Sequence, residues 1–151
     1  MKNIVVTTDL SPEAQAAFNV AQKLANAFHS HVRLLTVVED PQQAAMVYAM
    51  EFPVFPDSNI QRQLLEKVQV ELHKIAADYF PAISTDCSVR EAKGPVFREI
   101  IDFATETHAD MIVMATHGRT GVKHLLIGSI AERVAREACC PVVVVPTKRA
   151  S

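Results

Sequence analysis

Five short apolar runs, separated by longer segments with helical spacing, set the strongest limit on how this chain of 151 residues can fold. Most of the runs are rich in β-branched residues and lack strict alternation with polar ones, which is typical of strands buried on both faces of a parallel sheet. The runs are Asn3 to Thr8, His31 to Val38, Ile83 to Ala92, Met111 to Ala115 and Val142 to Val145. Their alternation with helices predicts an α/β fold, a three-layer α/β/α sandwich with right-handed crossovers.

Two of these runs have the features of edge strands. Ile83 to Ala92 alternates more regularly than the others, as a strand near the edge of a sheet does. Pro141 and Pro146 bracket the four valines of the last run, and proline is tolerated at a sheet edge. We therefore expect one edge strand in the middle of the chain and one at its end.

The segments between the runs carry helix signals. Ser11 is the predicted N-cap of the first helix, with Pro12 at the first helical position. Asp57 or Ser58 is predicted to cap a long amphipathic helix, on whose surface His73 lies. The stretch Pro41 to Asp57 holds large apolar residues, and its prolines exclude a regular helix. We interpret it as an apolar lid or a partner surface, and a disordered segment is the less favoured alternative.

The composition indicates one domain over residues 1–151, because 49% hydrophobic and only 21% charged residues can form a sizeable core. A net charge of -2 gives no reason to expect nucleic acid or a membrane surface as a partner. The chain shows no apolar run of membrane-spanning length and no signal peptide, so a cytoplasmic protein is expected.

The cysteines and histidines do not suggest a metal site. Cys87, Cys139 and Cys140 have no C-x-x-C spacing and are interpreted as buried free thiols. His29 and His31 lie two residues apart without a third ligand nearby, so metal binding is not expected there.

The stretch from Met111 to Ser129 has the layout of a strand, a glycine-punctuated loop and a helix. At such a junction glycines let the backbone approach a ligand, and the free N–H groups of the first helical turn favour an anion. Ser129 is the predicted N-cap, available to its own helix or to a phosphate oxygen; an ordinary strand-to-helix loop is the alternative. Asp9 follows the first strand, where it could hold a ribose hydroxyl or the water shell of Mg²⁺, or cap the turn.

This stretch resembles a known family. Met114-Ala-Thr-His-Gly118, nine residues, then Gly128-Ser129 is similar to the phosphate-loop pattern G-x-x-G-x9-G-[ST] of the universal stress protein family, in its ATP-binding branch. Arg119-Thr120-Gly121 and the stretch from Gly128 to Val134 resemble that family too. Ala115 departs from the pattern, because it stands at the first glycine. A methyl group there would crowd a phosphate or ribose, unless the backbone angles suit a residue with a side chain.

The resemblance implies a Rossmann-like fold, similar to adenine nucleotide alpha hydrolases, with strand order 3-2-1-4-5. Its switch point, where ligands bind, would lie between the first and fourth strands. The nucleotide contacts implied by the resemblance are Thr7, Thr8, Asp9, Val37 through its backbone, Met114, Ala115, His117, Gly118, Arg119, Gly128, Ser129 and Ile130. Gly94 is implied to help wall the same cleft.

These features favour a stress-response regulatory module that binds an adenine nucleotide. ATP is the favoured ligand, with AMP and ADP as alternatives, and Mg²⁺ would accompany the phosphates. Arg119 and Lys123 would add local positive charge. The family also implies a homodimer joined through Val142, Val143, Val144 and Val145.

Two other functions stay open. One is a weak ATP-hydrolysing enzyme, although the chain has no Walker A sequence and no nucleophile elbow, and His117 is the one candidate base in the loop. The other is a dimeric stress protein that binds no nucleotide, which Ala115 would explain. No catalytic residue is assigned.

Overall fold

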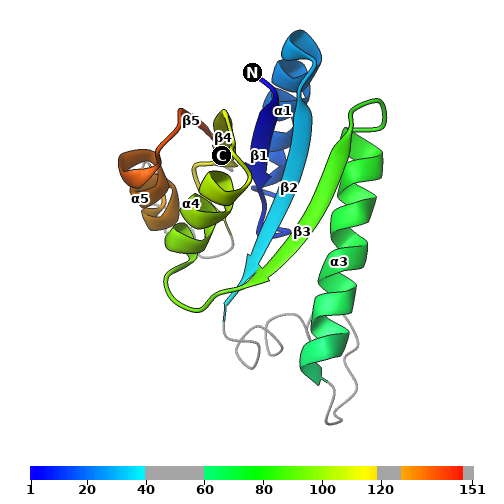
Figure 1. Cartoon of the computed structure of the whole chain (residues 1–151). Coiled ribbons are helices and arrows are strands. Elements are labelled where there is room, and N and C mark those ends of the chain that lie inside the picture. The colour runs from blue at the N-terminus through cyan, green and yellow to red at the C-terminus, as the bar shows by residue number, and fades with distance from the viewer. Residues whose placement is uncertain (40–59, 119–126, 148–151) are drawn as a thin grey trace.

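A five-stranded, all-parallel sheet forms the centre of the computed structural model, which describes residues 1–39, 60–118 and 127–147. The strands are β1 (Asn3–Thr7), β2 (His31–Val38), β3 (Thr85–Glu91), β4 (Met111–Ala115) and β5 (Val142–Val145). Their order in the sheet is β3-β2-β1-β4-β5 (Figure 1). The predicted α/β fold and strand order are therefore confirmed, and β3 and β5 are the edge strands, as their sequences indicate.

Helices cover both faces of the sheet and complete the three layers (Figure 1). One face carries α1 (Gln15–Phe28) and α3 (Ile60–Tyr79), and the other carries α4 (Val96–Glu106) and α5 (Ser129–Glu137). Successive residues of β1 point to opposite faces, so Ile4 and Val6 pack in the core under α1 and α3, whereas Val5 packs under α4 and α5. Each face of the sheet thus has its own apolar core.

The backbone hydrogen bonds of β5 define which of its residues face the neighbouring strand. Pro141 accepts the N–H of Ile112 at 2.9 Å, and Val145 accepts the N–H of Thr116 at 2.9 Å. In a strand the backbone groups of alternate residues point to the same side. The backbone groups of Val143 and Val145 therefore face β4, and those of Val142 and Val144 face away from the sheet.

The first helix begins later than its sequence predicts. The structure starts α1 at Gln15, with Ala14 in the N-cap position and no side-chain capping bond. The chain first makes a turn, in which Ala14 N–H donates to the carbonyl of Ser11 at 3.2 Å and to its hydroxyl at 3.3 Å. Ser11 thus caps this turn and not the helix, so the predicted positions of Ser11 and Pro12 are wrong.

The cysteines are free, as predicted, but they are not fully buried. Cys139 is exposed, and Cys87 and Cys140 are half-buried. Cys139 and Cys140 lie in the bend between α5 and β5. Partial burial raises the pKa of the Cys87 and Cys140 thiols.

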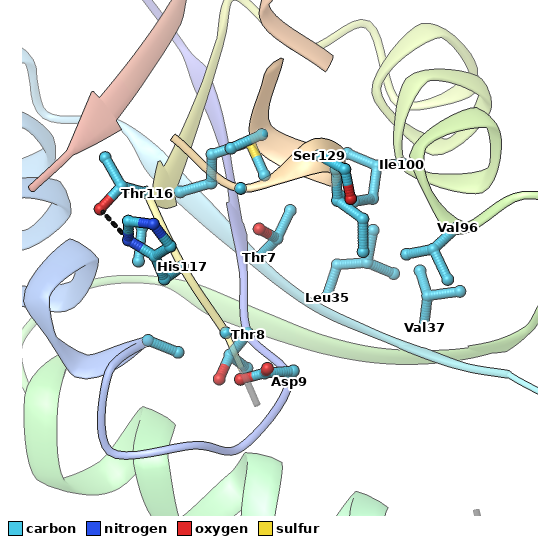
Figure 2. Close-up of a pocket in the computed structure, with 17 residues that line it drawn as sticks. Thr7, Thr8, Asp9, Leu35, Val37, Val96, Ile100, Thr116, His117 and Ser129 are labelled. Atoms are coloured by element: carbon cyan, nitrogen blue, oxygen red, sulfur yellow. Dashed lines mark hydrogen bonds between the residues drawn. The ribbon is translucent and has the colours of Figure 1, made fainter. Parts of the chain in front are cut away.

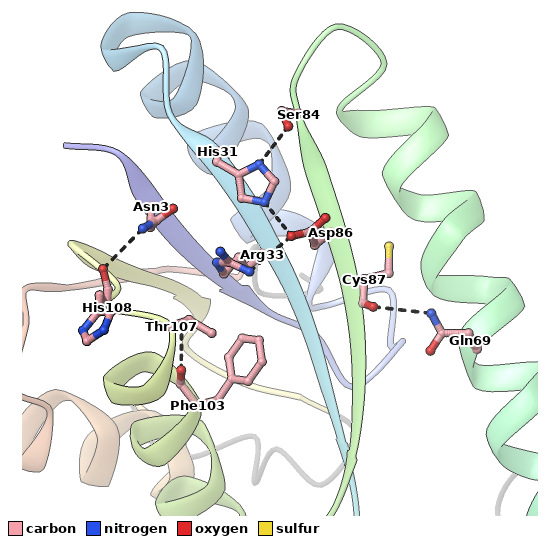
Figure 3. A network of polar contacts seen from close by, with 10 residues as sticks. All are labelled: Asn3, His31, Arg33, Gln69, Ser84, Asp86, Cys87, Phe103, Thr107 and His108. Carbon is pink, nitrogen blue, oxygen red and sulfur yellow. Dashed lines mark hydrogen bonds and ion pairs between the residues drawn. The ribbon is translucent and has the colours of Figure 1, made fainter.

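His31 belongs to a polar network at the amino ends of β2 and β3 (Figure 3). Its two ring nitrogens contact Ser84 Oγ and Asp86 Oδ2, each at 2.8 Å, and Arg33 also contacts Asp86. No cluster of three metal-ligating side chains occurs in the part of the chain that the structure describes. His73 is exposed on α3, as predicted.

Several predictions lie outside the described residues. These are the lid or partner surface from Pro41 to Asp57, the helix cap at Asp57 or Ser58, and the positive charges Arg119 and Lys123. Among residues 1–39, 60–118 and 127–147, no helix has the length and apolar character needed to cross a bilayer.

Candidate functional site

A cavity of about 150 Å³ opens where the carboxyl ends of β1 and β4 meet the amino end of α5 (Figure 2). This volume is several times the roughly 30 Å³ that one water occupies in the liquid, so the cavity has room for an organic group. It lies at the switch point of the sheet, because the chain leaves β1 toward β2 on one side and β4 lies on the other.

The cavity brings together every predicted contact residue that the structure describes: Thr7, Thr8, Asp9, Val37, Met114, Ala115, His117, Gly118, Gly128, Ser129 and Ile130. Arg119 lies outside the described residues. Gly94 does not line the cavity, and Val96, two residues later, does. The expectation that Gly94 walls the cleft is therefore wrong, because the helix and not the preceding turn faces it.

Six lining residues were not predicted: Ala14, Leu35, Val96, Ile100, Thr116 and Ala131. Two signals in the sequence point to some of them. Leu35 lies two residues before Val37 in the same strand, so both side chains point to the same face. Val96 and Ile100 are four residues apart and share one face of α4.

One side of the cavity is an apolar slot. Leu35 and Val37 reach it from β2, and Val96 and Ile100 reach it from α4, so their side chains gather together in Figure 2. Such a slot can cover the faces of a flat, apolar ring.

The backbone of Val37 also faces this slot. The last ladder bond between β1 and β2 is donated by Thr8 N–H to the carbonyl of Leu35, at 2.9 Å. Val37 lies two residues further along β2, beyond the end of β1, and its backbone groups point to the same side as those of Leu35. The N–H and C=O of Val37 therefore point to the space where β1 has ended.

Asp9 is positioned by the tight turn that follows β1. Leu10 has a φ of 65°, in the left-handed region, and its N–H donates to Thr8 Oγ1 at 3.0 Å. Ser11 donates to Asp9 Oδ1 from its N–H at 3.0 Å and from its hydroxyl at 2.5 Å. The Asp9 carboxylate is thereby oriented at the mouth of the cavity.

Two glycines permit close approaches at the other side of the cavity. A Cβ atom on Gly118 would overlap Asp9 Oδ2. A Cβ atom on Gly128 would lie 2.8 Å from the carbonyl oxygen of Thr116, which accepts the Gly128 N–H at 2.7 Å. Gly128 has a φ of -68°, so this position needs glycine for space and not for its backbone angles.

The amino end of α5 follows Gly128 directly. The helix begins at Ser129, with Gly128 in the N-cap position and no side-chain capping bond, so the prediction that Ser129 caps the helix is wrong. The backbone of Gly128 is fixed by Thr116, which brings Ser129 into the first helical turn. The first N–H groups of α5 and the Ser129 hydroxyl thus form a set of donors suited to an anion.

His117 belongs to a group of side chains that joins β4 to the residues after β5. Its Nδ1 lies 3.1 Å from Thr116 Oγ1 and 3.4 Å from Thr147 Oγ1. Thr116 Oγ1 also accepts the N–H of Thr147 at 3.1 Å. These contacts give His117 a structural part in holding the wall of the cavity.

Ala115 lines the cavity, yet its methyl group packs elsewhere. The residue is the last of β4 and is 9% exposed. It belongs to the core under α1 and α3, with Val113, whereas Met114 packs on the opposite face. The methyl group thus points to the face of the sheet that lies away from α5, so it does not crowd a ligand beside that helix.

Comparisons with known proteins agree on one family. The family model described as "Universal stress protein family" matches residues 1–146. Universal stress protein MJ0531 of Methanocaldococcus jannaschii is 31% identical over 144 residues, which cover 95% of this chain and 81% of the relative. The solved structure of hypothetical protein MJ0577 has a TM-score of 0.79 at 24% identity, covering 99% of this chain and 98% of the other.

Several structural neighbours were solved with adenine nucleotides. A universal stress protein of Archaeoglobus fulgidus in complex with dAMP has a TM-score of 0.62 at 20% identity and covers 96% of this chain and 98% of its own. Other neighbours are a complex with cAMP and an Arabidopsis thaliana protein with AMP bound. The family model spans nearly the whole sequence, and the chain therefore belongs to the universal stress protein family.

Proposed function

We propose that this protein binds an adenine nucleotide in the cavity between β1 and β4 and acts as a stress-response regulatory module of a single domain. The observation that carries the proposal is the order of groups across the cavity. The apolar slot is formed by β2, on one side of β1, and by α4, whereas Gly118 and Gly128 belong to the segment that follows β4, on the other side of β1. An adenine ring and a phosphate chain need these two environments at a distance from each other.

The slot suits adenine in its polar as well as its apolar requirements. The side chains of Val37 and Val96 offer surfaces for the faces of the ring. The backbone N–H and C=O of Val37 are a donor and an acceptor in fixed positions, complementary to a ring nitrogen and the amino group of adenine. The nucleotides named for three structural neighbours, cAMP, AMP and dAMP, contain adenine, which supports this choice of base.

The phosphates fit the opposite side. Gly118 and Gly128 bring the backbone close to Asp9 and to the Thr116 carbonyl, where a side chain has no room, and Ser129 adds a hydroxyl and a helix N-terminus. ATP is the ligand that we favour, and Mg²⁺ would accompany it and offset the negative charge of the phosphates. The Asp9 carboxylate at the mouth of the cavity is suited to hold the water shell of that ion.

Mass spectrometry of the purified protein under native conditions tests the proposal. We expect a fraction of the protein to retain a bound nucleotide, which denaturation releases as ATP, ADP or AMP. Calorimetric titration of nucleotide-free protein with ATP and with GTP should then show binding of ATP and much weaker binding of GTP. Equal affinity for the two, or no binding of either, would contradict an adenine site.

A weak ATPase activity is the second candidate function. The contacts of His117 favour a structural role over a catalytic one, since its Nδ1 lies close to the hydroxyls of Thr116 and Thr147. A steady-state ATPase assay of wild type and His117→Ala separates the candidates. We expect no turnover that depends on His117; a rate that the substitution abolishes would favour the enzyme.

Ala115→Gly should lower stability and leave nucleotide binding within about twofold of wild type. The substitution removes a buried methyl group and adds backbone freedom to β4, which together destabilise by about 1 to 2 kcal/mol. Because the methyl group packs under α1, its loss does not change the cavity. Urea unfolding and calorimetry with ATP measure the two effects. A clear loss of affinity would mean that the methyl group supports the ligand.

We further propose that the protein is a cytoplasmic homodimer joined through Val142 to Val145. The edge position of β5 supports the dimer, since Val142 and Val144 direct backbone donors and acceptors away from the sheet. The valines are only half-buried within the chain, so a partner strand would cover additional apolar surface. The free thiols suit a reducing compartment.

A further inference from the structure

Thr7 occupies the middle of the cavity floor. In the sheet it pairs with Leu35 of β2. The last pair between β1 and β4 is Val6 with Val113, and Thr7 and Met114 each follow that pair by one residue. Leu35 is fully buried and Met114 is 5% exposed, whereas Thr7 between them is half-buried and lines the cavity. The polar side chain in this row is thus accessible from the cavity, and its two neighbours are covered.

The hydroxyl of Thr7 differs from those of the other threonines around the cavity. Thr8 Oγ1 accepts the N–H of Leu10, and Thr116 Oγ1 accepts the N–H of Thr147. Both of those hydroxyls therefore have structural partners. Within the described part of the chain, the Thr7 hydroxyl makes no hydrogen bond, and it is not among the buried polar atoms that lack a partner. Water or a ligand can reach it.

Its place relative to the two ends of the cavity indicates which part of a ligand it meets. β1 lies between β2, which bears Val37, and β4, which leads to Gly118 and Gly128. Figure 2 shows Thr7 between the apolar side chains around Val37 and the polar group around His117. In a nucleotide, the sugar joins the base to the phosphates, so the sugar lies over β1.

We propose that the Thr7 hydroxyl is a specificity-determining group that hydrogen-bonds one of the two ribose hydroxyls and so distinguishes ribonucleotides from deoxyribonucleotides. This inference rests on the proposed function, because it assumes that the adenine end lies at Val37. A threonine hydroxyl can both donate and accept, which matches a ribose hydroxyl of either orientation. A binding site that hydrogen-bonds a hydroxyl discriminates against the analogue that lacks it.

Thr7→Val is the substitution that isolates this hydroxyl. Valine keeps the volume and the β-branching, so β1 should keep its geometry. Thr85→Val is the control away from the cavity, since Thr85 is also a half-buried threonine of a strand but lies in β3. Its hydroxyl donates to the carbonyl of Ile83 at 3.0 Å, so this variant removes a structural hydrogen bond and no group of the cavity. Circular dichroism and thermal unfolding establish that both variants are folded.

Calorimetric titrations of the full chain with ATP, 2′-deoxy-ATP and 3′-deoxy-ATP provide the test. Wild type and Thr85→Val should bind one of the two deoxy analogues about threefold to tenfold more weakly than ATP, the effect of one hydrogen bond. Thr7→Val should lose affinity for ATP by the same factor and bind that analogue as wild type does. The analogue that wild type binds more weakly than ATP identifies which ribose hydroxyl, 2′ or 3′, contacts Thr7.

Two results would overturn the assignment while leaving the proposed function intact. Wild type could bind all three nucleotides equally, or Thr7→Val could retain the discrimination of wild type, in which case another group, such as Asp9, reads the ribose. If wild type binds none of the three nucleotides, the proposed function fails, and the assignment of Thr7 fails with it.

Discussion

Gly128→Val should weaken ATP binding by at least about 100-fold, the largest functional effect that we expect from one substitution. A valine side chain here projects from the residue that precedes α5, beside the donors proposed for the phosphates. Its Cβ alone would lie 2.8 Å from the Thr116 carbonyl oxygen, so the backbone must shift. The loss of two hydrogen bonds to a charged phosphate accounts for this magnitude.

The same substitution should also lower stability by about 1 to 3 kcal/mol, because the Gly128 N–H and the Thr116 carbonyl are forced apart. Gly94→Val is the matched control. Gly94 lies one residue before the N-cap of α4, whereas Gly128 is the N-cap of α5, and a Cβ atom on Gly94 meets nothing within 4 Å. Calorimetry and urea unfolding of both variants separate binding from stability. Wild-type affinity for ATP in a folded Gly128→Val protein would refute the phosphate site.

Val144→Pro should convert a homodimer into a folded monomer, the largest effect that we expect on assembly. The N–H of Val144 faces away from β4, so proline at this position removes a donor from the free edge without breaking the sheet. A partner strand on that edge would lose a hydrogen bond and meet the proline ring. Light scattering at micromolar concentration measures the change in mass.

Val143→Pro is the control that separates an effect on the free edge of β5 from a general disruption of the strand. The N–H of Val143 faces β4, so its loss should destabilise the subunit by about 3 kcal/mol or more, whatever its oligomeric state. Thermal unfolding should therefore separate the two proline variants. A monomeric wild type, or a folded Val144→Pro protein that remains a dimer, would show that β5 is not the interface.

These two proline positions illustrate what the sequence left open. Four consecutive valines predict a strand, and the flanking prolines predict an edge, and β5 is an edge strand. The sequence treats all four valines alike, because strand propensity does not specify register. The structure distinguishes them, since the hydrogen bonds of Ile112 and Thr116 determine which residues face β4.

Gly94 and Gly128 also show what the sequence predicts and what only the structure adds. From the sequence, Gly128→Val is expected to leave the fold intact, because the residue belongs to a loop pattern and not to the apolar core. The structure adds the carbonyl oxygen of Thr116 in the space that a side chain would need. Gly94 and Gly128 both precede a helix in the sequence, yet Gly128 lines the cavity and Gly94 does not.

By itself, the sequence determined the α/β class, the five strands and the two edges, because hydrophobic periodicity and turn residues are local properties. The family resemblance of its loop motif also implied most, but not all, of the residues that line the cavity. Tertiary structure alone decided that Ser11 caps a turn, that the Ala115 methyl group packs under α1, and that the Thr7 hydroxyl is accessible. The cap at Ser11 is a local contact with Ala14, but a capping residue suits a turn as well as a helix, so its type does not tell the two apart. The other two depend on which groups from distant segments meet, and such contacts are not encoded in the spacing of neighbours along the chain.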